Sequence, residues 1–270
     1  MIEVPADYLS LAANQLEIGF SKTEVVFSHA SGFIYFYKNK YYLITNWHNV
    51  TGRNPIERSR ITREHAGIPD NIKTFFRFDN NSLNGPYVRI MLYEDEELKV
   101  PKWLVHPKFK ERVDVVAIQI NPVKGIIFRP INQGDFDNNI PPIVGDECFV
   151  IGYPFSQSRF LGMPIWKKAS IATEPILDEE HLPKILIDTA TRPGLSGSPV
   201  IYQRTGIHNV YHGKFNKDSM IGRIRGFLGI YSGRIGKDEF QAQLGIVWKA
   251  KVIEEIIDGN MRGNTEFQNW

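Results

Sequence analysis

Short runs of β-branched and aromatic residues recur along this 270-residue chain, and each run is closed by Gly, Pro, Asn or Asp. Side chains of these types fit the pleated surface of a β-strand, so the pattern predicts an all-β fold. The runs lie at residues 32–37, 41–45, 88–92, 113–120, 147–151, 185–190, 198–202, 226–231 and 243–248. Only Lys38-Asn39-Lys40 separates the first run from the second, which predicts a β-hairpin with a three-residue loop.

Helical patterns occur near the two ends of the chain. Residues 252–258 place apolar side chains on one face of a helix, and Gly259 follows as a stop signal. A second helix is predicted within residues 6–16, where Asp7 or Ser10 is suited to cap the first turn.

The strand pattern divides into two sets at residues 121–144, a stretch with proline and glycine that is the best candidate for a linker. The length allows one large domain or two of about 120 residues, and either is long enough to bury a core. Segments 51–73, 80–86 and 203–225 are predicted to be irregular or inserted. The mixed charges of segment 51–73 suit a solvated loop or a binding patch.

Charge and cysteine content limit the classes of partner. Lys and Arg number 32 against 30 Asp and Glu, and the formal charge of +2 does not support binding to a nucleic-acid backbone. The single cysteine, Cys148, cannot form an intramolecular disulfide, which is consistent with a reducing compartment. Residues 1–7 lack the features of a signal peptide, and no apolar stretch is long enough to span a membrane. We therefore expect a soluble, cytoplasmic protein that binds neither nucleic acid nor membranes.

Histidine spacing gives no sign of a metal site. Besides His48 the chain has six histidines, His29, His65, His106, His181, His208 and His212. None of these six is paired with a cysteine or a second histidine at a spacing typical of zinc ligands. His208 and His212 are four residues apart, but their segment carries Gly and Asn and does not favour a helix. We expect no metal and no other cofactor.

A serine in a glycine-rich turn is the first sign of chemistry. The segment Arg192-Pro193-Gly194-Leu195-Ser196-Gly197-Ser198 links two predicted strands. Its glycines allow a sharp turn that presents the Ser196 hydroxyl outward and points neighbouring N–H groups into one small space. That is the geometry of a nucleophile beside an oxyanion hole. Glycine and serine are also common in ordinary loops, so a purely structural turn is the alternative.

His48 and Asp114 are candidates for a general base and its partner. His48 follows an apolar strand, and imidazole is the side chain best suited to accept a serine proton near pH 7. Asp114 interrupts the apolar run 113–118, where an unpaired charge is costly and a partner is implied. That partner is an imidazole N–H or an arginine, and a packed structural histidine is the alternative for His48.

The chain order His48, Asp114, Ser196 resembles that of the trypsin-like, chymotrypsin-fold serine peptidases. The absence of cysteine pairs is similar to the bacterial and intracellular-type branch of that family. Other segments resemble family motifs in the same order, namely residues 31–34 with 43–48, 106–109, 152–154, 229–233 and 244–248.

The resemblance implies two six-stranded antiparallel β-barrels and a C-terminal helix, with the active site in the cleft between the barrels. His48 and Asp114 would come from the first barrel and Ser196 from the second. The expected units are an N-terminal extension, the first barrel, the second barrel with the helix, and a tail, at residues 1–24, 25–122, 123–258 and 259–270.

The resemblance also implies hydrolysis of peptide bonds in a polypeptide through an acyl-enzyme. Ser196 would attack the carbonyl, His48 would transfer the proton, and Asp114 would orient the imidazole. The backbone N–H groups of Gly194 and Ser196 would bind the oxyanion. Ser232 corresponds to the family serine that bonds the aspartate, with a simple edge-strand hydroxyl as the alternative.

Substrate-binding residues follow from the same resemblance. They are Ala190, Thr191, Ser232, Gly233, Arg234 and Gly245. Ala190 at the base of the S1 pocket and Gly245 on its wall provide no acid, so a Lys or Arg at P1 is not expected. Arg234 either favours an acidic P1 residue or points to solvent. A small or apolar P1 residue is the first expectation, and an acidic one is the second.

Leu195 departs from the family pattern, because secreted zymogen-type members carry an Asp there that pairs with a newly cut amino terminus. Activation by such pairing has no anchor in this chain. Two alternatives to a self-sufficient enzyme therefore stay open. One is an enzyme that a protein partner activates by reordering residues 193–196, and the other is a catalytically silent binding module on the same fold.

Overall fold

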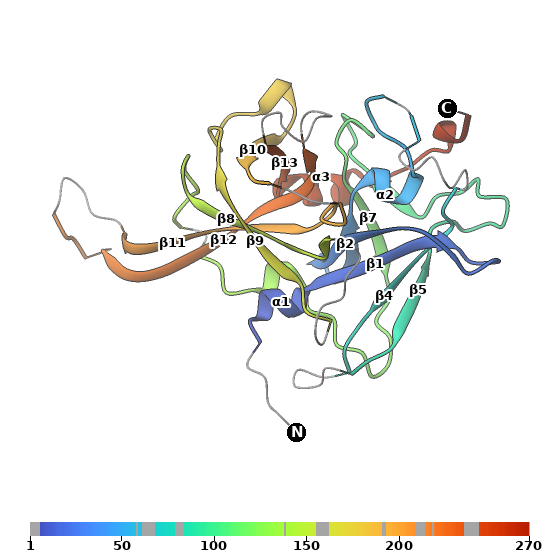
Figure 1. Cartoon of the computed structure of the whole chain (residues 1–270), viewed down its shortest axis with the longest axis horizontal. Coiled ribbons are helices and arrows are strands. Elements are labelled where there is room, and N and C mark those ends of the chain that lie inside the picture. The colour runs from blue at the N-terminus through green and yellow to red at the C-terminus, as the bar shows by residue number, and fades with distance from the viewer. Residues whose placement is uncertain are drawn as a thin grey trace.

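The computed structural model places the chain in two curled antiparallel β-sheets that pack against each other (Figure 1). It describes residues 6–57, 59–60, 68–78, 84–137, 139–154, 162–190, 193–208, 214–217, 219–234 and 243–269. The all-β fold class expected from the strand pattern is confirmed.

Within the described residues, the first sheet has eight strands in the order β14-β6-β7-β3-β2-β1-β4-β5. Their bounds are β1 (Ala13–Phe20), β2 (Val25–Tyr37), β3 (Lys40–Thr45), β4 (Asn71–Phe75), β5 (Tyr87–Met91), β6 (Trp103–Val105), β7 (Val116–Ile120) and β14 (Met261–Arg262). An isolated bridge joins Tyr93 to Pro101, and the Lys102 N–H donates to the Leu92 carbonyl at 2.8 Å. These contacts bring the end of β5 beside β6, so that the sheet curls toward closure.

The first sheet has more than the six strands expected, because both terminal segments contribute to it. β1 lies between β2 and β4, although residues 1–24 are predicted to be an extension. In the predicted tail, β14 pairs with β6, and the fully buried Phe267 ring packs edge-on against Trp47 with centroids 5.8 Å apart. Both ends of the chain therefore support the first sheet.

The helix predicted within residues 6–16 is shorter than expected. α1 (Tyr8–Ala12) has Asp7 as its N-cap, and the Leu9 N–H donates to the Asp7 carboxylate at 3.0 Å. β1 follows at once, since the residues from Ala13 onward pair with β2 along their whole length.

The β2–β3 hairpin has a tighter turn than predicted. Tyr37 pairs with Lys40, which leaves only Lys38 and Asn39 in the loop. Their φ angles are 48° and 60°, and two successive positive φ values define the type I′ turn whose twist matches that of the strands. Lys40 therefore belongs to β3, and the loop has two residues instead of three.

The second sheet is a closed six-stranded barrel in the described part of the chain, as expected, with the order β10-β13-β12-β11-β8-β9. Its strands are β8 (Glu147–Gly152), β9 (Ile165–Ile171), β10 (Lys184–Asp188), β11 (Pro199–His208), β12 (Met220–Arg234) and β13 (Leu244–Lys249). β11 and β12 stay paired from Gln203 and Arg225 out to His208 and Met220. Segment 203–225, predicted to be irregular, thus contains a β-hairpin that projects from the body (Figure 1).

The C-terminal helix is present as α3 (Lys251–Gly259). Its buried face consists of Val252, Ile253, Ile256 and Ile257, as the apolar spacing predicts. The stop differs, because Gly259 lies inside the helix and Asn260 takes the left-handed conformation (φ 45°) that ends it. Other helical segments in the described part of the chain include α2 (Trp47–Thr51) and the 3₁₀ turns η1 (Ile131–Gln133), η4 (Glu179–His181) and η5 (Glu266–Asn269).

Each curled sheet encloses its own apolar core, and a third apolar cluster contains residues of both sheets. The third cluster contains Leu9 of α1, Phe33 of β2, Ile151 of β8, Ile230 of β12 and Ile253 of α3. Burying one such side chain stabilises a fold by about 1.5–3 kcal/mol, so packing holds the two sheets in a fixed relation. Among the described residues, no helix is long and apolar enough to cross a membrane.

Candidate active site

His48 lies on a one-turn helix at the junction of the two sheets. α2 begins directly after β3, and its buried Trp47 and Val50 side chains pack into the core of the first sheet. Gly52 ends the helix in the left-handed conformation (φ 68°) that glycine adopts readily, and its N–H donates to the His48 carbonyl at 2.9 Å. The helix therefore holds the His48 ring on a rigid support.

The His48 ring is paired with the Asp114 carboxylate. His48 Nδ1 is 2.6 Å from Asp114 Oδ2, and the His48 backbone N–H donates to Asp114 Oδ1 at 2.9 Å. The two side chains are 14% and 6% exposed, so water screens this pair little. A carboxylate acceptor selects the tautomer that carries its proton on Nδ1, which leaves Nε2 able to accept a proton.

Asp114 lies just outside the strand in which the sequence places it. β7 begins only at Val116, because the Val115 N–H donates to the Val113 carbonyl at 2.7 Å and forms a tight turn. Val113 and Val115 are both fully buried, while the Asp114 carboxylate is directed to His48. Asn46, whose side-chain amide donates to the Asp114 carbonyl at 2.7 Å, holds this turn against the start of α2.

A second hydroxyl reaches the same carboxylate from the other sheet. Ser232, near the end of β12, donates its hydroxyl to Asp114 Oδ2. Asp114 therefore accepts hydrogen bonds from the His48 helix and from β12 of the second sheet. Of the two readings of Ser232 from sequence, a bond to the aspartate matches the geometry, and a free edge-strand hydroxyl does not.

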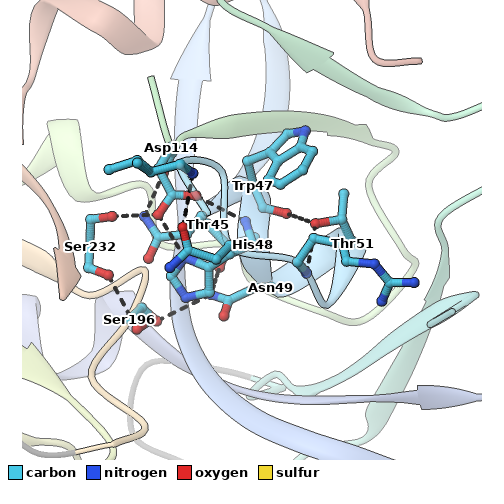
Figure 2. A network of polar contacts seen from close by, with 12 residues as sticks. Thr45, Trp47, His48, Asn49, Thr51, Asp114, Ser196 and Ser232 are labelled. Atoms are coloured by element: carbon cyan, nitrogen blue, oxygen red, sulfur yellow. Dashed lines mark hydrogen bonds and ion pairs between the residues drawn. The ribbon is translucent and has the colours of Figure 1, made fainter. Parts of the chain in front are cut away.

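Ser196 lies in the turn that leads into β11, beside the other three side chains (Figure 2). Its hydroxyl donates to the Ser232 carbonyl at 3.5 Å, a long hydrogen bond. Within the described residues it makes no hydrogen bond with the His48 ring. The four side chains are thus gathered at one place, with the His48–Asp114 pair formed and the Ser196 hydroxyl turned toward β12.

The backbone of the Ser196 turn is held by glycine conformations. Gly194 and Gly197 have φ values of 95° and 84°. A Cβ at Gly197 would lie 2.1 Å from the Ser31 carbonyl oxygen, so only glycine fits there. In the part of the chain that the structure describes, the backbone N–H groups of Gly194 and Ser196 have no acceptor. Such N–H groups can donate to an anionic oxygen.

The predicted substrate-binding residues lie on neighbouring segments. Ala190 follows the end of β10, while Ser232, Gly233 and the exposed Arg234 end β12. Gly245 of β13 pairs directly with Arg234, which brings it to the same edge. Thr191 lies outside the described residues.

Several residues of the site were missed from sequence. Ser31 and Asn49 bond to the turn that carries Ser196, and Asn46 bonds to the Asp114 carbonyl. Thr45 bonds to Ser31 and Asn49, and Tyr231 packs against Gly245. Ser31, Thr45 and Asn46 lie in segments 31–34 and 43–48, whose resemblance to family motifs is the signal that could have found them. Across the described ranges, no three His, Cys, Asp or Glu side chains are grouped so as to hold a metal ion.

Two antiparallel β-sheets with a His–Asp pair beside a serine are typical of trypsin-like peptidases, and a comparison with protein families agrees with that class. Residues 30–206 match the trypsin-like peptidase domain family, and this chain belongs to that family. No curated protein matches the chain. Among solved structures it is similar to the active form of the Rv3671c protease from M. tuberculosis, with 16% sequence identity and a TM-score of 0.48. That similarity covers 96% of this chain and 83% of the other.

Proposed function

We propose that this chain is a serine endopeptidase that hydrolyses peptide bonds of a polypeptide through an acyl-enzyme. The observation that carries the proposal is the His48–Asp114 pair, at the junction where the other sheet presents Ser196. A buried carboxylate that orients an imidazole beside a serine hydroxyl is the arrangement that activates the hydroxyl for attack on a carbonyl.

In the proposed reaction, Ser196 Oγ attacks the substrate carbonyl while His48 Nε2 accepts the hydroxyl proton. Asp114 stabilises the imidazolium that forms. His48 then donates the proton to the leaving amine, the C–N bond breaks, and the acyl group stays on Ser196. A water molecule, deprotonated by the same imidazole, attacks the acyl carbon and releases the carboxylic acid. No cofactor enters these steps.

The backbone N–H groups of Gly194 and Ser196 are proposed to stabilise the negative charge on the substrate oxygen. Both residues are partly exposed, so a substrate carbonyl can reach them. In another peptidase, removing one donor of this kind costs about 2.7–4 kcal/mol of transition-state stabilisation. Two such donors account for a large part of the rate that the site would provide.

The position of the Ser196 hydroxyl also fits a second candidate function, a peptidase that a protein partner activates. To meet His48, this hydroxyl must leave its 3.5 Å hydrogen bond to the Ser232 carbonyl. Catalytic hydrogen bonds are often long before substrate binds, so a rotation on binding suffices for a self-sufficient enzyme. The same observation favours, as the alternative, a peptidase whose protein partner completes the site.

For specificity we propose a small or apolar P1 residue, with an acidic P1 second. Ala190 places no acid near the pocket, and the buried Tyr231 ring occupies space beside Gly245. The exposed Arg234 side chain supports the acidic option. We also propose a cytoplasmic enzyme, because its one cysteine is buried and unpaired.

Labelling with a fluorophosphonate probe tests the proposed function. The wild-type protein should be labelled, and both Ser196→Ala and His48→Ala should lose labelling. Ser198→Ala is the matched control, because it removes a fully buried hydroxyl from the same turn. Labelling that survives Ser196→Ala would refute the nucleophile. If the pure protein stays unlabelled and reacts only in cell lysate, the partner-activated alternative gains support.

A further inference from the structure

Ser31, at the centre of β2, bonds to the turn that carries Ser196. Its backbone N–H donates to the Ser196 carbonyl at 2.8 Å, and its hydroxyl donates to the Gly194 carbonyl at 2.9 Å. The same hydroxyl accepts the Tyr153 N–H at 3.0 Å. Ser31 is fully buried, so these bonds are shielded from water. One residue of the first sheet thus holds two carbonyls of a turn in the second.

Asn49, the residue after His48, holds the same turn from the helix. Its side-chain amide donates to the Ser196 carbonyl at 3.4 Å and to Thr45 Oγ1 at 2.9 Å. Thr45 Oγ1 in turn donates to the Ser31 carbonyl at 2.9 Å. Figure 2 draws Thr45 and Asn49 in the same polar network as His48 and Ser196. Ser31, Thr45 and Asn49 therefore form one connected polar group, here called the polar clamp.

The clamp reaches the part of the turn that matters for oxyanion binding. Peptide units are planar, so a bond to the Gly194 carbonyl fixes the 194–195 unit, and bonds to the Ser196 carbonyl fix the 196–197 unit. The peptide between them supplies the Ser196 N–H. On its other side the turn is anchored by Leu195, whose side chain is 1% exposed in the core of the second barrel. The turn is held from both sheets at once.

We propose that the polar clamp positions the Ser196 turn so that its N–H groups are oriented for the oxyanion before substrate arrives. This inference rests on the proposed peptidase function. The clamp residues are positioning residues, because their hydrogen bonds go to the backbone of the Ser196 turn and to one another. Donors that are fixed in advance stabilise the transition state more than the bound substrate. Loss of the clamp should therefore lower kcat and leave KM nearly unchanged.

The test compares variants that remove clamp hydrogen bonds with variants that keep them. Ser31→Ala and Thr45→Val remove a hydroxyl, while Thr45→Ser retains one. Thr74→Val is the matched control, because Thr74 is equally buried in the first sheet and donates to the Gln15 carbonyl at 2.8 Å, away from the site. Activity is measured as kcat and KM on p-nitrophenyl acetate and as the rate of fluorophosphonate labelling.

Ser31→Ala and Thr45→Val should each lower kcat by about tenfold, less than the roughly 10²–10³-fold loss expected for a direct oxyanion donor. Thr45→Ser should restore the wild-type rate, and Thr74→Val should retain it. Retained kcat in both clamp variants overturns the clamp while leaving the peptidase function intact. A KM effect that Thr74→Val shares also overturns it, since that pattern marks a general loss of packing.

Hydrogen exchange distinguishes failure of the polar clamp from failure of the proposed peptidase function. The backbone amides of residues 194–198 should exchange faster in Ser31→Ala, Thr45→Val and Asn49→Ala than in Thr74→Val or the wild type. If the wild-type protein does not react with the probe, the proposed peptidase function fails, and exchange alone decides whether the clamp orders the turn. Unchanged exchange in the clamp variants overturns the clamp in either case. If one variant does not fold, the other clamp positions still give the result.

Discussion

The aromatic ring of Tyr231 lies against Gly245 on the neighbouring strand. A Cβ built at Gly245 would be 2.8 Å from Tyr231 Cε2, and 3.2 Å from both Ile187 Cγ1 and Thr189 Cγ2. Tyr231 is 2% exposed and belongs to the core of the second barrel. Protein atoms therefore fill the space beside the edge at which we place the P1 side chain.

Replacing Tyr231 by valine should broaden the P1 preference toward larger apolar residues. The shorter side chain opens volume beside Gly245, and truncating a large buried ring costs about 3 kcal/mol of folding stability. Tyr202→Val is the control, because Tyr202 is buried in the same barrel core and packs beside Gly226 instead. Cleavage of a peptide library by the three proteins measures the effect. Equal P1 profiles would argue against Tyr231 as a determinant, and a wild-type profile dominated by Lys or Arg contradicts the proposed specificity.

Gly197 should not tolerate alanine. Its φ of 84° is strained for other residues, and a Cβ there would lie 2.1 Å from the Ser31 backbone oxygen. Gly145→Ala is a close control, because Gly145 has a φ of 85° but nothing within 4 Å of the added carbon. Gly145→Ala should lower the folding stability only by the cost of a positive φ at a non-glycine residue, about 1–2 kcal/mol. Gly197→Ala should lose more stability and also fluorophosphonate labelling, measured by thermal unfolding and by labelling rate.

If Gly197→Ala and Gly145→Ala destabilise the protein equally and both label normally, the close approach of Ser31 to the turn is wrong. That outcome would also remove the steric basis of the polar clamp. Both variants are needed, because backbone strain alone would lower the stability of either one.

Local sequence patterns were sufficient for most of the described strands and for selecting His48, Asp114 and Ser196 as candidates, but not for the residues that hold them. His48 and Ser196 each follow or precede an apolar run, and Asp114 is a charge within one, so chain order and residue type together indicated the constellation. The face of α3 was also predictable, because helical spacing is a local property. The family resemblance supplied the expectation that residues this far apart in sequence meet.

The contacts that hold the site together were not predictable, because they join distant segments. Ser31 and Gly194 are 163 positions apart, and nothing in the sequence around either marks the partner. The hairpin of β11 and β12 was missed for a different reason. The projecting parts of both strands contain Gly206, Gly222 and several charged residues, which are uncommon in strands and weaken the sequence pattern. Pairing between the two strands nevertheless stabilises their extended conformation.

Cys148 should be unreactive in the native protein. Burial, together with the Asp146 and Glu147 carboxylates, raises the pKa of its thiol to about 12. At pH 8 the thiolate, which is the reactive form, is almost absent, and the raised value means that it becomes appreciable only as the pH approaches 12. Iodoacetamide should therefore modify Cys148 only after unfolding, as mass spectrometry can measure. Fluorophosphonate labelling should survive both the reagent and Cys148→Ala. Rapid alkylation of the folded protein would contradict this burial.

Asp114→Asn tests whether the carboxylate orients His48. An amide in place of the carboxylate can present its NH₂ group to Nδ1, which would then carry the lone pair and move the ring proton to Nε2. In that tautomer Nε2 cannot accept the Ser196 proton, and the acylation rate should fall by about 10⁴-fold, as it does in a chymotrypsin-type peptidase.

Asp70→Asn is the matched control, because Asp70 is equally buried and accepts the Ser21 N–H and hydroxyl at 2.7 and 2.6 Å, with no histidine involved. Each variant loses a buried carboxylate, so both should be destabilised, but only Asp114→Asn should lose acylation. If both retain acylation while unfolding at similar temperatures, Asp114 is a structural residue and the proposed mechanism is wrong.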